Sequence, residues 1–135
     1  MKIVINRCYG GFGLSLEAKK RICELRGGSA FYFHCPNDEY IPLTEDEAQT
    51  IDAQNTLLKW VHVFDTPTPI EGHDINEYDI ERNDQALVQA VEELGPKANG
   101  RFAELSVVEI PDDIIWELVE YDGIESVHEQ HRSWD

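Results

Sequence analysis

The stretch that decides the fold is KIVINRCYGGFGLSLEAKKRICEL, residues 2–25. Its β-branched start predicts a strand over Lys2 to Asn6. Glycines then recur in Gly10-Gly11-Phe12-Gly13, and Ser15 stands at a helix N-cap position before apolar residues at helical spacing. Gly27-Gly28 is typical of a helix end. The stretch therefore predicts a strand, a glycine-rich turn and a helix.

The middle of the chain continues with strand and helix patterns. An aromatic run over 30–35 predicts a second strand, and its place after the first helix predicts a parallel β-α-β pair. Thr44 and Glu47 match a capping box, which predicts a helix over 45–54. Apart from Lys59 and His62, residues 57–64 are apolar on both alternating faces, which predicts a central strand.

A polar segment and the clearest helix pattern follow. Residues 65–83 contain two prolines and a glycine without a clear period, which predicts the longest loop of the chain. Asn83 or Asp84 then caps a helix that ends at Gly95-Pro96. We expect its buried stripe to consist of Leu87, Val88, Val91 and Leu94.

The C-terminal third predicts two strands and a tail. Residues 102–110 and 114–121 are rich in β-branched and aromatic residues, which favours strands joined by a turn. The second segment also has helical spacing behind Asp112 or Asp113, so a helix over 114–121 stays open as an alternative. Residues 124–135 are predicted to form a polar tail.

Length and composition bound the class of protein. A chain of 135 residues has the usual size of one domain, so we expect a single domain over 1–135. The patterns predict an α/β or α+β fold, with a single-layer mixed sheet of about five strands packed by about two to four helices. Its short apolar runs predict neither a membrane span nor a signal peptide, so we expect a cytoplasmic protein without a membrane partner.

Charge is distributed unevenly along the chain. The net charge of −16 argues against direct binding to nucleic acid or to anionic membranes. Residues 1–35 nevertheless carry a net charge of +4, which leaves −20 on the remainder. The glycine-rich turn therefore lies in the net-positive segment of an acidic chain.

The glycine-rich turn is the first candidate site. A strand, a glycine loop and a capped helix present backbone N–H groups suited to a phosphate or carboxylate. The turn matches neither the dinucleotide fingerprint nor the P-loop, so a plain tight turn with Phe12 in the core is the alternative. The residues predicted to bind a nucleotide-like anion are Tyr9, Gly10, Gly11, Phe12, Gly13, Ser15, Lys19, Lys20 and Arg82.

An acidic face is the second candidate site. Residues 104–135 hold ten acidic residues and one basic residue. Solubility is the simplest explanation, and binding of Mg²⁺ or Ca²⁺ is another. A third is a face that mimics nucleic acid toward a partner protein, formed by Glu117, Glu120, Asp122 and Glu125.

Histidine and cysteine spacing gives weaker signals. On a helix, His128 and His131 would share a face, which makes them weak candidates for a metal site, but their spacing is one residue short of the zinc-protease motif. Three cysteines without a Cys-x-x-Cys pair fit neither a disulfide framework nor a four-cysteine zinc site. Cys8 precedes a helix N-terminus, where a thiol pKa can be lowered, but no base accompanies it.

Two parts of the sequence carry a family resemblance. They are NRCYGGFGLS at 6–15 and a C-terminal region that includes EYDG at 120–123 and HRSW at 131–134. With these segments the chain resembles a family of small phage and prophage proteins without an assigned activity. The likeness hardly covers 36–79, which we therefore expect to be a variable central region. The resemblance implies a phage accessory protein that acts in the host cell.

Together these observations favour a non-enzymatic binder that sequesters a nucleotide-like anion or inhibits a host defence protein. One alternative is an acidic nucleic-acid mimic that blocks a nuclease or a DNA-binding protein. A second is a metal-dependent hydrolase. We expect a host protein or a small nucleotide-like ligand as partner and no cofactor, and a homo-oligomer is left open.

Overall fold

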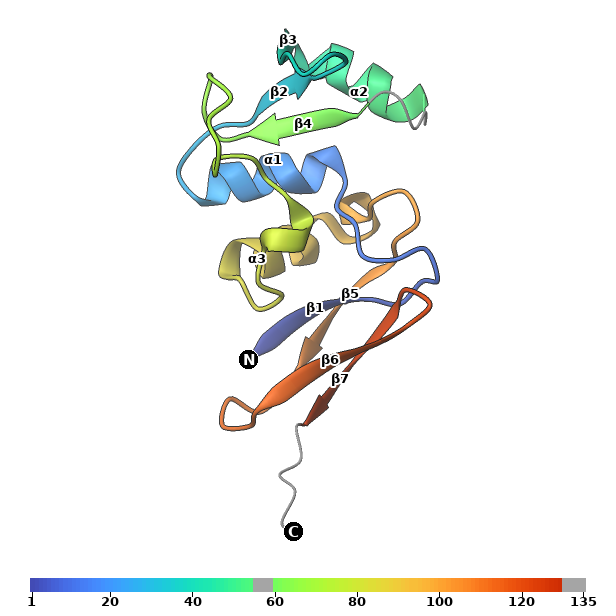
Figure 1. Cartoon of the computed structure of the whole chain (residues 1–135). Coiled ribbons are helices and arrows are strands. Elements are labelled where there is room, and N and C mark those ends of the chain that lie inside the picture. Colours follow the sequence, from blue (N-terminus) through green and yellow to red (C-terminus); the bar gives the residue numbers. More distant parts are fainter. Residues whose placement is uncertain (55–59, 130–135) are drawn as a thin grey trace. The chain divides into compact units, whose positions relative to one another are not determined.

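A computed structural model describes residues 1–54 and 60–129 of the chain (Figure 1). The chain divides into two compact units, whereas the sequence predicts one domain. Unit 1 consists of Met1–Ala18 and Ile80–Asp135, and unit 2 of Lys19–Asp79. Helix α1 (Leu16–Leu25) crosses the boundary between them. Ser15 Oγ caps this helix by accepting a hydrogen bond from Ala18 N at 3.1 Å, as predicted.

Strand β1 (Lys2–Asn6) is the centre of unit 1. It pairs antiparallel with β5 (Leu105–Glu109), and helix α3 (Gln85–Leu94) packs on both strands. The four residues from Ile3 to Asn6 are all buried. A strand with both faces buried carries apolar residues at consecutive positions, which explains the apolar run at the start of the sequence.

Helix α3 begins and ends where the sequence predicts. The Asp84 side chain accepts a hydrogen bond from Leu87 N at 3.0 Å and so caps the first turn. Gly95, at φ +57°, ends the helix, and a short 3-10 helix, η2 (Gly95–Ala98), follows. Leu87, Val88 and Val91 are buried, as expected for the apolar stripe.

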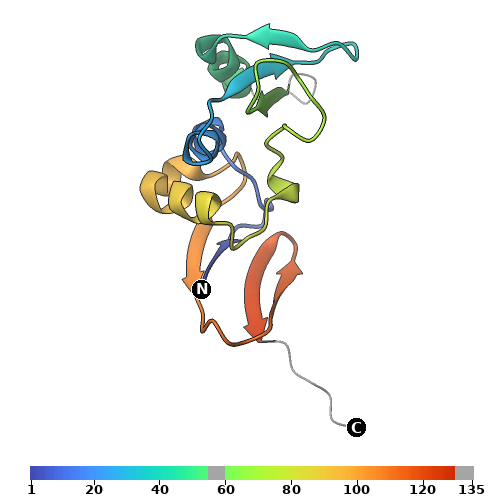
Figure 2. The same cartoon turned by 90° about the vertical axis from the view of Figure 1, so that its left-hand side faces the viewer.

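A β-hairpin completes the described part of unit 1. Strands β6 (Trp116–Tyr121) and β7 (Ile124–Glu129) pair antiparallel, and β7 contacts β1, as both views show (Figures 1 and 2). Asp122 and Gly123 form the turn with positive φ, the conformation that Asp-Gly favours between two strands. A helix over 114–121 is therefore wrong, and so is a tail over 124–129, because the hairpin gives these residues backbone partners.

Unit 2 contains a three-stranded sheet with a helix against it. Strand β2 (Phe31–His34) lies between β3 (Ile41–Leu43) and β4 (Val61–Phe64), and both ladders are antiparallel. Helix α2 (Glu45–Gln54) packs on these strands. The predicted capping box forms, since Thr44 Oγ1 accepts from Glu47 N and Glu47 Oε1 accepts from Thr44 N.

Three expectations about the sheet are wrong. Strands β1 and β2 belong to different ladders, so the expected parallel pair does not form. Strand β4 is an outer and not the central strand of its three-stranded sheet, and the backbone of residues 73–75 bonds to its other side. Residues 57–59 of that expectation lie outside the described residues. The described strands form three small sheets instead of one mixed sheet of about five, and every ladder in them is antiparallel.

The predicted fold class is confirmed, since the described chain is a mixed α/β structure. Residues 65–83 form a connecting segment without an α-helix or a named strand, as predicted, apart from a 3-10 turn, η1 (Glu77–Asp79). Within the described ranges, every helix is too short or too polar to cross a bilayer.

Candidate functional site

The glycine-rich turn packs against two other backbone segments of unit 1. We call this junction the glycine corner, and it comprises residues 8–13, 100–102 and 122–123. A Cβ built on Gly10 would lie 2.0 Å from Phe102 Cβ, and one on Gly123 would lie 2.5 Å from the Tyr9 carbonyl oxygen. A Cβ on Gly100 would lie 2.6 Å from the Gly13 carbonyl carbon. Close backbone approach therefore explains these glycines without a ligand.

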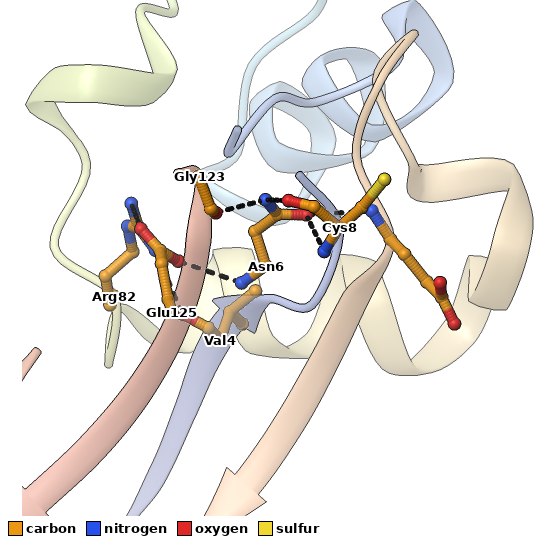
Figure 3. A network of polar contacts seen from close by, with 7 residues as sticks. Val4, Asn6, Cys8, Arg82, Gly123 and Glu125 are labelled. Carbon is orange, nitrogen blue, oxygen red and sulfur yellow. Dashed lines mark hydrogen bonds and ion pairs between the residues drawn. The ribbon is translucent and has the colours of Figure 1, made fainter. Parts of the chain in front are cut away.

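The Asn6 side chain connects the backbone segments of the glycine corner by hydrogen bonds (Figure 3). Its side chain is fully buried at the end of β1. The amide Nδ2 donates to the carbonyls of Cys8 at 2.7 Å and Gly123 at 2.6 Å. Its Oδ1 accepts from Cys8 N at 3.2 Å and Glu104 N at 2.9 Å. Because both polar atoms of the amide are fully used, Asn6 is a structural tie between the segments.

Arg82 and Glu125 form a buried ion pair beside this amide. The Arg82 guanidinium contacts both Glu125 oxygens, with 2.8 Å between Nη2 and Oε2. Glu125 Oε1 also accepts from Asn6 N at 2.8 Å. On its other side, the guanidinium lies 3.5 Å from the centre of the Phe12 ring. The exposed fractions of the two charged side chains are only 17% and 8%, so the pair is held inside unit 1.

The structure also locates the other residues of the predicted anion site. Phe12 is buried, as the alternative of a plain tight turn expects. The Ser15 hydroxyl donates to the Lys97 carbonyl at 2.6 Å in addition to capping α1. Lys19 and Lys20 lie in unit 2, where they pair with Glu77 at 2.9 Å and Glu45 at 2.8 Å.

The three cationic groups predicted to attract an anion are thus each paired with a carboxylate. Arg82 is paired within unit 1, whereas Lys19 and Lys20 are paired within unit 2. Their charge is balanced locally, which weakens their attraction for an external anion.

Three aromatic residues in the glycine corner or next to it in sequence are exposed to solvent. Tyr9, Phe102 and Tyr121 are 71%, 64% and 74% exposed, and we call them the aromatic surface. The close approaches of Gly10 to Phe102 and of Gly123 to Tyr9 bring their backbone segments together. The Arg101 guanidinium lies 6.0 Å from the Phe102 ring centre. Sequence reasoning missed Phe102 and Tyr121, because an aromatic residue beside a turn or in a strand is expected to be buried.

The predicted acidic face does not form as one surface. Side chains alternate along a strand, so Glu117 and Glu120 project from opposite faces of the hairpin. Glu120 lies opposite Glu125 in the ladder, and Glu125 is buried against Arg82. Asp122 is exposed in the turn.

Histidines and cysteines form no centre in the described ranges. His128 lies on β7, with Nε2 2.8 Å from Ser126 Oγ, so the helix that would align it with His131 is absent there, and His131 lies outside the described residues. Across 1–54 and 60–129, no three histidines, cysteines or carboxylates gather to hold a metal. Burial raises the pKa of the Cys23 thiol to about 11, with a further contribution from Asp65. Cys8 is half-buried.

The described chain is thus a mixed α/β protein in which every strand ladder is antiparallel. Comparison of the chain with protein-family models, with curated proteins and with solved structures finds no match in any of the three.

Proposed function

We propose that this chain is a non-enzymatic binding protein, a phage accessory factor that inhibits a host defence protein by docking on it. The observation that supports this is the aromatic surface of Tyr9, Phe102 and Tyr121. A group of exposed aromatic residues on neighbouring backbone segments is typical of a protein contact site, whereas single exposed ones are common. Tyrosine and arginine are also enriched among the residues that contribute most to binding.

The glycine corner suits such a role because it is already ordered. Asn6 joins the backbones of Cys8, Glu104 and Gly123 through four hydrogen bonds. A preorganised surface loses less conformational entropy when it binds, so more of the contact energy appears as affinity.

Sequestration of a nucleotide-like anion has less support. Close packing against Phe102 explains Gly10 and the positive φ of +93° explains Gly11, while Arg82, Lys19 and Lys20 are each paired with a carboxylate. The acidic nucleic-acid mimic also has less support, because its carboxylates do not share one exposed surface. Glu125 is buried, and Glu117 and Glu120 project from opposite faces of the hairpin.

The test is a plating assay in bacteria that each carry one phage-defence system. Expression of the chain should restore plating of a sensitive phage on at least one of these strains. The double variant Tyr9→Ala/Tyr121→Ala should lose this effect. Tyr78→Ala is the matched control, because Tyr78 is 76% exposed and lies in η1 of unit 2. It should keep the effect.

Failure to restore plating on any defence strain would refute the inhibitor function. Equal loss in the Tyr78→Ala control would refute the aromatic surface as its contact site. Melting with a panel of nucleotides and cyclic nucleotides tests the other branch, because a bound ligand raises the melting temperature of the protein. A shift with any of them would favour sequestration over inhibition.

A further inference from the structure

The hydrogen bonds of unit 1 show which backbone groups of β5 point away from β1. Arg7 N donates to Glu104 O and Ile110 N donates to Met1 O, each at 2.8 Å. Along an antiparallel ladder, residue pairs that exchange backbone hydrogen bonds alternate with pairs that do not. Glu104 and Ile110 belong to bonded pairs, so the even-numbered residues of β5 direct their backbone N–H and C=O groups toward β1. The backbone groups of Leu105, Val107 and Glu109 therefore point away from β1.

The other side of β1 agrees with this assignment. Val4 N donates to Arg82 O at 2.8 Å and Asn6 N donates to Glu125, so these two residues turn their backbone groups away from β5. They lie opposite Val107 and Leu105 in the ladder. Those two positions of β5 consequently present their own N–H and C=O groups outward.

This edge has little protection within the described part of the chain. No strand there pairs with the outer side of β5, and the Leu105 N–H alone is covered, by Asn99 Oδ1 at 2.9 Å. Proteins usually protect an open edge with proline, charge or a bulge. From Leu105 to Val108 the strand has neither proline nor charge, and its side chains are half-buried.

We propose that β5 pairs with β5 of a second copy of this chain, antiparallel and centred on Val107. In this register the Val107 N–H of each copy donates to the Val107 carbonyl of the other, and each Glu109 N–H donates to a Leu105 carbonyl. Leu105, whose own N–H is already used, lies opposite Glu109, so no like charges face each other across the new ladder.

The self-pairing is two-fold symmetric, as in most soluble dimers, and it joins two two-stranded ladders into one sheet of four strands. Each copy carries a net charge of −16, which opposes association over the whole surface. Salt screens that repulsion, so the dimer should strengthen as the salt concentration rises.

Sedimentation equilibrium of the full chain at rising protein concentration tests the proposal. The average mass should rise toward twice that of the monomer, and more steeply at high salt. Val107→Pro removes the Val107 N–H, which is the central donor of the proposed pairing and makes no hydrogen bond to β1. This variant should therefore stay monomeric. Val107→Thr is the matched control, because it keeps the N–H and a β-branched side chain, and it should still dimerise.

Amide exchange keeps the test decisive if the proline variant does not fold. In the unaltered chain, the Val107 and Glu109 amides should become protected as the protein concentration rises. A chain that stays monomeric with unprotected Val107 and Glu109 amides overturns the proposal, as does dimerisation of a folded Val107→Pro variant. Tyr9→Ala/Tyr121→Ala should dimerise normally, so failure here is separate from failure of the proposed function.

Discussion

Glu125→Ala should destabilise unit 1 far more than loss of an ordinary surface carboxylate. The substitution leaves the Arg82 guanidinium inside unit 1 without its partner and removes the acceptor of Asn6 N. Breaking one side of a buried ion pair costs about 3–5 kcal/mol. The Arg82 side chain keeps 17% of its surface in water, which favours the lower end of that range. A loss of about 3 kcal/mol corresponds to a roughly 100-fold larger open population.

Amide exchange of unit 1 is the assay, because it reports the free energy of opening at chosen residues. Ile3 and Leu87 are fully buried and serve as reporters. Glu92→Ala is the matched control, since Glu92 pairs with Lys2 at 2.9 Å but is 44% exposed. Loss of an exposed pair costs at most about 1 kcal/mol. Equal effects of the two substitutions on the reporters would contradict the reasoning.

Further predictions concern the corner, pH and thiol chemistry. Gly11→Ala should cost about 1–3 kcal/mol from backbone strain at φ +93°, and Gly123→Ala should lower the melting temperature further because its Cβ also meets backbone. Burial lowers the pKa of His62, and Lys19 lowers it further, so the unfolded chain binds more protons; the melting temperature should fall as pH drops below 6.5, and less in His62→Gln. Cys23, buried and with its pKa raised to about 11, should react with a thiol reagent only after unfolding, as mass spectrometry would show.

Local signals predicted the helices well. The Ser15 and Asp84 caps and the Thr44 capping box each form as expected, because a cap depends on residues only a few positions apart. Strand β7 does not follow from the sequence, because 124–135 contains polar residues at most positions and the pairing of β7 with β6 is not a local property.

The candidate site shows the same division. Glycines at 10–13 predicted a turn, but the sequence could not tell a turn built for an anion from one packed against other backbone. That distinction depends on Phe102 and Gly123, which lie about ninety and one hundred and ten positions further along the chain. The sequence points to Arg82 as a ligand-binding residue because its partner Glu125 lies 43 positions further along the chain, beyond the reach of local patterns.

By itself, the sequence determined the class of the fold, the ends of the helices and the acidic character of the chain. These depend on periodicity, capping and composition, which act over short distances or sum over the chain. Only the tertiary structure decided which strands pair, that Arg82 is neutralised inside unit 1, and that Tyr9, Phe102 and Tyr121 are exposed to solvent. Such outcomes depend on which distant segments share a core, and short-range patterns do not encode that choice.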